Sequence, residues 1–301
     1  MKVSRVKMTV DELEVSKFIA GLWRQNAWGF TDAELQAHIE SLLESGVTTM
    51  DHAYVYRSEP QFGRVLAAAP HLRDGMEIVS KFGIRPAGFG GMGGQKTSHY
   101  DNSPGHLTDS VEATLSDLHT DYLDVLLVHR PDYLMDARAL ASAFSKLKEQ
   151  GKVRFFGVSN FSASQFEMLQ AACDFPLVTN QIEFSPVCLD PLENGVLDQC
   201  QRHNMNPMLW SCLGGGRLFT GSDEQSVRVR DALRLVADEV GAQSLDQVIY
   251  AWVLSLPCNP LPIIGSGRIE RVMSAIAAEN LKLDREQWYS IWQASTGYAV
   301  P

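Results

Sequence analysis

Short runs of Val, Ile and Leu recur along the chain and alternate with amphipathic stretches of about 10–16 residues. Such nearly continuous apolar runs are typical of parallel strands that are buried on both faces. Eight strands are predicted, at residues 18–23, 48–53, 77–82, 125–129, 153–158, 178–184, 207–211 and 261–264. Helices are predicted at residues 31–45, 59–69, 107–118, 137–150, 162–172, 194–203, 226–256 and 268–278.

Eight strands that alternate with helices predict an α/β fold of the (β/α)8 TIM-barrel type, with residues 1–301 forming a single domain. A doubly wound sheet is the alternative. Against it, no G-x-G-x-x-G motif follows the first strand, where residues 21–25 read Gly-Leu-Trp-Arg-Gln. Start signals support two of the helices, because Thr31 precedes Glu34 in a capping-box pattern and Ser162 precedes a helical pattern.

Four segments lie outside the repeating pattern. Residues 7–10 and 14–18 predict an N-terminal β-hairpin joined by residues 11–13. Region 226–256 splits at Gly241 into two helical patterns, one of which is an accessory helix, and residues 284–295 predict a further helix packed across the barrel. Residues 83–105 predict a flexible loop over the barrel mouth, and its glycine-rich part, 88–94, lacks the ending of a phosphate-binding loop.

Composition narrows the function classes. A net charge of −10 and a pI near 5.3 argue against a nucleic-acid partner. Residues 1–10 lack a signal-peptide core, and no apolar run approaches the length of a membrane span, so a cytoplasmic protein without a membrane partner is expected. Scattered cysteines and histidines predict no metal site, and the absence of heptads favours a monomer.

Ionisable residues end three consecutive predicted strands: Asp51, Lys81 and His129. The carboxyl ends of barrel strands converge on one mouth, where catalysis takes place. Burying a carboxylate, an ammonium and an imidazole there is costly unless they face one another. Tyr56 follows Asp51 by five residues, and these four side chains are therefore the candidate catalytic group.

At these residues the sequence resembles the aldo-keto reductase superfamily. Residues 51–57 read Asp-His-Ala-Tyr-Val-Tyr-Arg, Lys81 lies in Ser-Lys-Phe-Gly, and His129 lies in Leu-Val-His-Arg-Pro-Asp. Further matches follow in order at residues 157–161, 180–184, 210–216 and 262–266. Three residues depart from the family pattern, since His52 replaces a threonine, Arg57 a glycine and Cys212 a proline.

The resemblance implies an NADP(H)-dependent oxidoreductase that reduces aldehydes and ketones to alcohols by hydride transfer. A carbonyl that accepts hydride develops alkoxide charge and needs a proton donor. Tyr56 is the candidate acid, and the neighbouring cation of Lys81 is expected to lower its pKa. Asp51 would orient Lys81, and His129 would donate a hydrogen bond to the carbonyl oxygen.

The resemblance also assigns a cofactor site. The nicotinamide carboxamide would meet Ser159, Asn160 and Gln181, and its ring would stack on Trp210. The pyrophosphate would lie against the glycine-containing loop that carries Ser211, Leu213, Gly216 and Arg217, while the first strand would contribute Leu22 and Trp23. The adenosine 2′-phosphate would bind after the eighth strand, at Gly265, Ser266, Gly267, Arg268 and Arg271.

Two other functions remain open: a cofactor-binding regulatory or sensor barrel with little turnover, and a barrel lyase or aldolase that uses Lys81 as a Schiff base. The substrate is a small carbonyl compound that the sequence does not name. Its specificity would come from loops 26–30, 83–105, 187–194 and 218–225. Trp28, Phe82, Phe184 and Phe219 indicate an apolar or aromatic lining.

Overall fold

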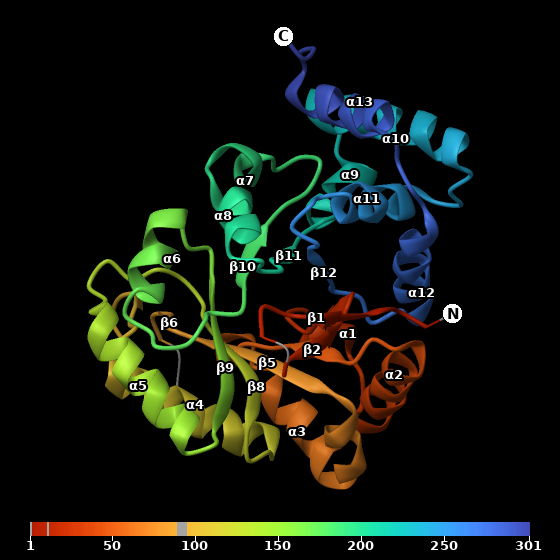
Figure 1. Ribbon diagram of the computed structural model, residues 1–301. Coiled ribbons are helices and arrows are strands. Elements are labelled where there is room, and N and C mark those ends of the chain that lie inside the picture. Colours follow the sequence, from red (N-terminus) through yellow and green to blue (C-terminus); the bar gives the residue numbers. More distant parts are fainter. Residues whose placement is uncertain (1, 11, 89–94) are drawn as a thin grey trace.

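Eight parallel strands close into a barrel, which confirms the predicted (β/α)8 fold (Figure 1). The computed structural model describes residues 2–10, 12–88 and 95–301. The strands follow one another around the barrel in chain order, and the last pairs with the first to close it. They are β3 (Ile19–Gly21), β4 (Thr49–Asp51), β5 (Glu77–Phe82), β8 (Leu123–Val128), β9 (Val153–Ser159), β10 (Asn180–Glu183), β11 (Met208–Trp210) and β12 (Leu261–Ile264).

Strands β5 and β12 coincide with their predicted ranges, and the other six overlap theirs with displaced ends. The strands β3, β4 and β11 are three residues each, shorter than predicted, because the chain turns out of the barrel early to build the loops of the mouth. The helices that cover the barrel are α2 (Asp32–Ser45), α3 (Glu59–Ala68), α4 (Pro104–Leu118), α5 (Ala137–Glu149), α6 (Ala163–Gln170), α8 (Val196–Arg202), α11 (Leu245–Leu254) and α12 (Ile269–Ala277).

Local signals fix several helix ends. Thr31 and Glu34 form a reciprocal capping box at the start of α2, and Ser162 and Gln165 form another at α6. Gly46 ends α2 with a φ of 87°, a left-handed conformation that glycine adopts without a steric penalty. Of the described residues, no helix is both long and apolar enough to cross a membrane.

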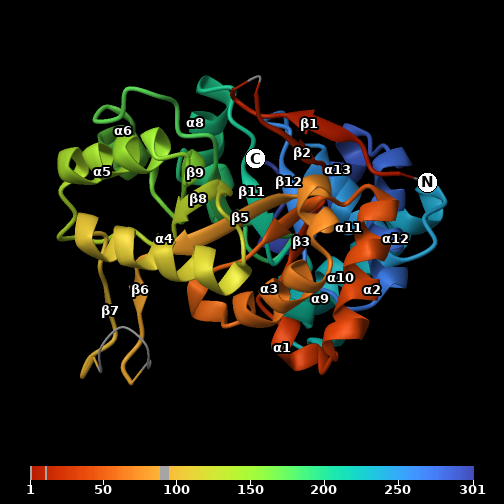
Figure 2. The same ribbon diagram turned by 90° about the horizontal axis from the view of Figure 1, so that it is seen from below.

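The N-terminal hairpin closes the end of the barrel opposite the mouth (Figure 2). Its strand β1 (Arg5–Lys7) begins and ends earlier than predicted, whereas β2 (Glu14–Ser16) begins at the predicted residue and ends earlier; Asp11 of the predicted turn lies outside the described residues. Apolar side chains of the hairpin join those that fill the barrel interior, namely Val6, Met8, Leu13 and Val15 with Ile19, Val79, Val125, Leu127, Val178, Met208 and Leu261. Burying them removes apolar surface from water at an otherwise open end.

Part of the predicted loop 83–105 is an antiparallel ribbon of β6 (Ile84–Arg85) and β7 (His99–Tyr100). The ribbon projects from the mouth end of the barrel, on the same side as α1 (Gln25–Trp28) and α9 (Arg217–Thr220) (Figure 2). The loop also ends earlier than predicted, because Ser103 caps α4 and Pro104 occupies its first turn. Most of its glycine-rich part, residues 89–94, lies outside the described residues.

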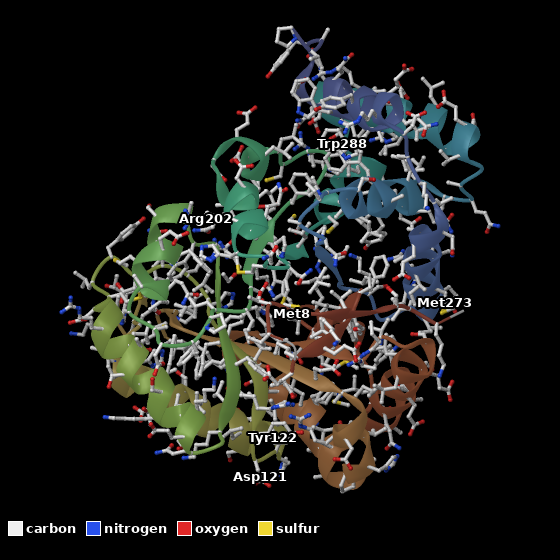
Figure 3. The ribbon with its side chains drawn as sticks, viewed as in Figure 1. Met8, Asp121, Tyr122, Arg202, Met273 and Trp288 are labelled. Carbon is white, nitrogen blue, oxygen red and sulfur yellow. The ribbon has the colours of Figure 1, made fainter. Side chains whose placement is uncertain are left out.

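Two accessory helices pack beside the barrel wall, α10 (Glu224–Val240) and α13 (Arg285–Thr296) (Figure 1). Region 226–256 does divide at Gly241, and α10 is its accessory half. The tail helix α13 was predicted to pack across the barrel; it packs mainly on α10. Trp288, labelled in Figure 3, stacks on Trp252 of α11 at 4.9 Å between ring centroids, and each indole N–H donates to the other residue's backbone carbonyl.

Candidate active site

Three neighbouring strands bring Asp51, Lys81 and His129 to one end of the barrel. Asp51 is the last residue of β4, Lys81 lies near the end of β5, and His129 directly follows β8. Parallel pairing of β4 with β5 and of β5 with β8 sets the three at similar height. All three side chains are buried, as the predicted convergence requires.

A single turn of 3₁₀ helix, Tyr54–Tyr56, carries Tyr56 to the same place. Arg57 ends the turn with a φ of 56°, in the left-handed region where the family pattern has glycine. Lys81 Nζ then donates to Asp51 Oδ2 at 2.8 Å, to the His52 carbonyl at 2.7 Å and to Tyr56 Oη at 3.2 Å. The structure thus brings the predicted Asp–Lys–Tyr group into direct contact.

The Lys81 ammonium is fully buried but satisfied by three oxygens. Burial alone would lower the pKa of Lys81, but the Asp51 carboxylate and the Tyr56 phenol outweigh it and hold this pKa above its usual value. The second oxygen of Asp51, Oδ1, accepts from Gln181 Nε2 at 2.9 Å. Lys81 therefore remains a cation, and Asp51 has a partner for each of its oxygens.

Two opposing effects set the pKa of the Tyr56 phenol, burial and the Lys81 cation. Burial raises the pKa of Tyr56 above its usual value, and the Lys81 cation opposes that rise without reversing it. Lys81 therefore lowers this pKa as expected, but burial outweighs it, because the desolvation of the phenolate is a larger effect than its attraction to one cation at 3.2 Å. Tyr56 is protonated throughout the neutral range.

His129 is a neutral imidazole beside Tyr56. Burial lowers the pKa of His129 well below its usual value, and the cations of Lys81 and Arg130 lower it further. The two rings meet edge to face, with centroids 5.7 Å apart. His129 Nδ1 is buried and has no hydrogen-bond partner among the described residues. A neutral imidazole has one N–H to donate, which suits contact with a carbonyl oxygen.

A chain of hydrogen bonds joins the polar residues at the ends of β9, β10 and β11. Asn160 Nδ2 donates to Ser159 Oγ at 2.7 Å, and Ser159 Oγ donates to the Gln181 carbonyl at 2.9 Å. Trp210 Nε1 donates to Asn160 Oδ1 at 3.2 Å. These hydrogen bonds fix the N–H edge of the Trp210 indole. Residues of all three strands face the same cavity.

That cavity occupies the mouth and has a volume of about 970 Å³. Most of the residues predicted for the catalytic and cofactor sites line it: Trp23, Asp51, Tyr56, His129, Ser159, Asn160, Gln181, Trp210, Ser211, Leu213, Gly216, Gly265, Ser266 and Arg271. Lys81 lies behind Tyr56 and Asp51. The cavity is thus large enough for a cofactor and a small substrate together.

Four residues predicted for the cofactor site lie away from the cavity wall. Leu22 is 1% exposed and packs in the hydrophobic core, because the chain turns inward after β3. Arg217 is held by Asp223, with two guanidinium nitrogens on the two carboxylate oxygens at 3.0 and 2.6 Å. Gly267 and Arg268 begin the approach to α12, and Gly267 lies under the Trp28 ring.

The lining is largely apolar, but other residues form it than those predicted. Of the four aromatic residues expected to form it, only Phe219 does. Phe82 and Phe184 point outward from their strands and are buried beneath helices, where Phe184 stacks on Trp252. Trp28 belongs to a cluster with Phe30. Of the four predicted specificity loops, 83–105 contributes Ile84 and Pro86, 218–225 contributes Phe219 and Thr220, and the other two contribute no lining residue.

Sequence reasoning missed four charged residues of the cavity lining: Arg24, Arg130, Asp246 and Glu270. Arg130 follows His129 and lines the cavity, with its guanidinium carbon 5.9 Å from the centroid of the Trp210 ring. The signal was present, because a residue next to one at a strand end also reaches the mouth. Arg24, which stacks on Trp23 at the rim, was missed for the same reason.

Comparisons with known proteins decide the family. A family model described as "Aldo/keto reductase family" matches residues 17–295. The chain belongs to the aldo/keto reductase family. It is 49% identical to the oxidoreductase YdhF of Escherichia coli (strain K12), over 99% of this chain and 100% of that protein. It is also 41% identical to a 6-dehydroglucose reductase of Agrobacterium fabrum, over 96% and 97%.

A solved structure supports the fold of this aldo/keto reductase. A thermostable aldo-keto reductase, crystallised with the inhibitor epalrestat, superposes with a TM-score of 0.78 over 97% of this chain and 99% of that one, at 23% identity. Family and relatives together make the protein an oxidoreductase of carbonyl compounds. Aldo/keto reductases use nicotinamide cofactors in general.

Proposed function

We propose that the protein is an NADP(H)-dependent carbonyl reductase in which Tyr56 is the proton donor. The observation that carries the proposal is the contact of Tyr56 Oη with a buried, charged Lys81 at 3.2 Å, at the floor of the cavity. A phenol with a raised pKa keeps its proton until negative charge develops on a nearby oxygen, and an adjacent ammonium then stabilises the phenolate.

The other residues of the site hold Lys81 and the substrate in position for this proton transfer. Asp51 holds the Lys81 ammonium in place at 2.8 Å, and Gln181 holds Asp51 at 2.9 Å. His129, neutral at all physiological pH values, would donate a hydrogen bond to the substrate oxygen and set which face of the carbonyl is presented. The proton that leaves Tyr56 is replaced from solvent through the mouth.

The residues present fit a nicotinamide dinucleotide. Ser159, Asn160 and Gln181 supply hydroxyl and amide groups of the kind that a carboxamide needs, and the face of Trp210 offers a stacking surface. Gly215 and Gly216 have φ values of 64° and 97°, and a Cβ on either would meet no atom within 4 Å. Their backbone can therefore approach a pyrophosphate closely. When bound, the reduced nicotinamide supplies the hydride that no side chain can provide.

Arg271 would select the 2′-phosphate. It is exposed, lines the cavity in the first turn of α12, and forms no ion pair among the described residues. Arg271→Ala should raise the Kd for NADPH roughly 10- to 100-fold, because a charge-assisted hydrogen bond contributes about 1.5–3 kcal/mol. The Kd for NADH should stay unchanged. Titration of tryptophan fluorescence measures both constants.

A matched control is Arg234→Ala, which removes one positive charge from an exposed ion pair with Asp231 on α10. It should leave both constants as in the wild type. Added salt should weaken NADPH binding to the wild type more than to Arg271→Ala. Equal wild-type affinities for NADPH and NADH would show that Arg271 does not bind a phosphate.

The function itself is tested by NADPH consumption with a panel of aldehydes, diketones and sugars, together with detection of the alcohol. We expect one alcohol for each NADPH oxidised. Tight NADPH binding with no turnover of any carbonyl would instead indicate a sensor barrel. A substrate trapped on Lys81 by borohydride would indicate Schiff-base chemistry. The position of Lys81 argues against the latter, since all three of its donor directions are used.

A further inference from the structure

Three arginines line the cavity, Arg24, Arg130 and Arg271, and none of them forms an ion pair with a described residue; Arg130 is the one that directly follows a residue of the catalytic group, His129. Lys81 is paired with Asp51, and Arg217 with Asp223 outside the wall. The Arg130 guanidinium makes no ion pair and no hydrogen bond with any described residue. A half-buried guanidinium has lost part of its hydration, so it gains most from a ligand that restores its hydrogen bonds.

The main chain around Arg130 is fixed. Asn102, which is 1% exposed, donates from Nδ2 to the Arg130 carbonyl at 3.0 Å and from its backbone N–H to Asp132 Oδ2 at 3.0 Å. On the other side, His129 donates its backbone N–H to Phe82 at 2.9 Å. The side chain therefore leaves from an anchored point, and the Trp210 ring lies beneath its guanidinium.

Arg130 also lies close to the reacting groups. Its charge lowers the pKa of both Tyr56 and His129, although other causes dominate each. The acidic group that opposes it from β10 is Glu183, with which it forms no ion pair among the described residues; Arg130 lowers the pKa of Glu183, which burial raises. A molecule whose carbonyl oxygen meets Tyr56 and His129 would place its next few atoms beside the guanidinium.

We infer that Arg130 binds oxygen atoms of the substrate beyond the reacting carbonyl, and thereby selects oxygen-rich carbonyl compounds, hydroxyaldehydes or oxo acids, over apolar ones. The inference rests on the proposed function and names the substrate class of the same site. The planar fork of donors matches a carboxylate or a pair of hydroxyls. An apolar substrate would leave that fork desolvated and unsatisfied, which costs transition-state affinity.

Two pairs of aldehydes of matched shape test the selection. Glyceraldehyde is compared with 2-methylbutanal, in which methyl groups replace the hydroxyls, and 4-oxobutanoate with 4-methylpentanal, in which they replace the carboxylate oxygens. For each pair the ratio of kcat/KM, oxygenated over apolar, is measured in the wild type and in Arg130→Met. The ratio is used because an effect of Arg130 on Tyr56 changes both members of a pair alike.

We expect Arg130→Met to lower at least one of the two ratios tenfold or more. A loss confined to 4-oxobutanoate, stronger at low salt, identifies an anionic group. A loss confined to glyceraldehyde identifies hydroxyls. Arg130→Lys should keep part of the preference for 4-oxobutanoate, because it keeps the charge but not the fork.

Arg234→Gln serves as the control for net charge and should leave both ratios unchanged. Ratios that are the same in the wild type and in Arg130→Met would overturn the inference while leaving the proposed function intact. If the wild type binds NADPH but reduces none of the four aldehydes or any other carbonyl, the proposed function fails, and the inference with it. Melting temperature and NADPH affinity establish that Arg130→Met is folded.

Discussion

Tyr56→Phe should lower kcat for carbonyl reduction by roughly 10²- to 10⁴-fold, the usual contribution of a positioned general acid. The substitution removes the Oη that lies 3.2 Å from Lys81 Nζ and keeps the ring that packs against His129. The Kd for NADPH should be nearly unchanged, because the hydroxyl acts on charge that develops only during the reaction. Steady-state kinetics and fluorescence titration measure the two quantities.

Tyr54→Phe is the matched control, because Tyr54 begins the same 3₁₀ turn but does not line the cavity. Burial raises the pKa of Tyr54 to about 12, so it too is a protonated phenol. Its loss should change kcat no more than a few-fold. Near-wild-type turnover by Tyr56→Phe would remove Tyr56 as the acid and direct attention to His129.

Lys81→Met should abolish most activity and also destabilise the fold. The variant leaves the Asp51 carboxylate, which is 4% exposed, without its cation. Breaking a buried ion pair on one side typically costs about 3–5 kcal/mol. We expect a decrease of that size in the free energy of unfolding, measured in urea, and a loss of kcat comparable with that of Tyr56→Phe.

A double variant separates the two effects. Asp51→Asn combined with Lys81→Met removes both charges, so most of the lost stability should return, whereas activity should not, because the phenolate of Tyr56 still lacks its cation. Recovery of activity together with stability would mean that Lys81 is only a structural residue. An unchanged free energy of unfolding in Lys81→Met would show that Asp51 is satisfied by Gln181 and solvent.

The barrel and the catalytic group could be predicted because both depend on periodicity and position along strands. Near-continuous apolar runs mark buried parallel strands, and their polar ends mark the mouth. The alternation of side chains along a strand also predicts which of them face away from the cavity. Side chains alternate between the two faces of a strand, and Lys81 faces inward, so Phe82 must face outward toward the helices. In the same way Gln181 faces the cavity, and Phe184, three residues later, must lie on the opposite face.

Other features depend on contacts that no periodicity encodes. Arg217 is held by Asp223, a pairing that depends on how α9 folds back toward the start of α10. The pKa of Tyr56 results from a balance of burial against one cation, and only the depth of the site decides its sign. The ribbon of β6 and β7 is too short for a hydrophobic pattern, yet it brings Ile84 and Pro86 to the cavity.

The central claim is direct reduction of a carbonyl carbon with Tyr56 as proton donor. The most direct measurement is a single turnover with NADPH carrying deuterium at the transferable position of the nicotinamide, with the alcohol analysed by mass spectrometry and NMR. We expect one deuterium on the carbinol carbon, of one stereochemical configuration, because His129 and Tyr56 fix the face of the carbonyl. An alcohol without label on that carbon, or with label of both configurations, would contradict the proposed reaction.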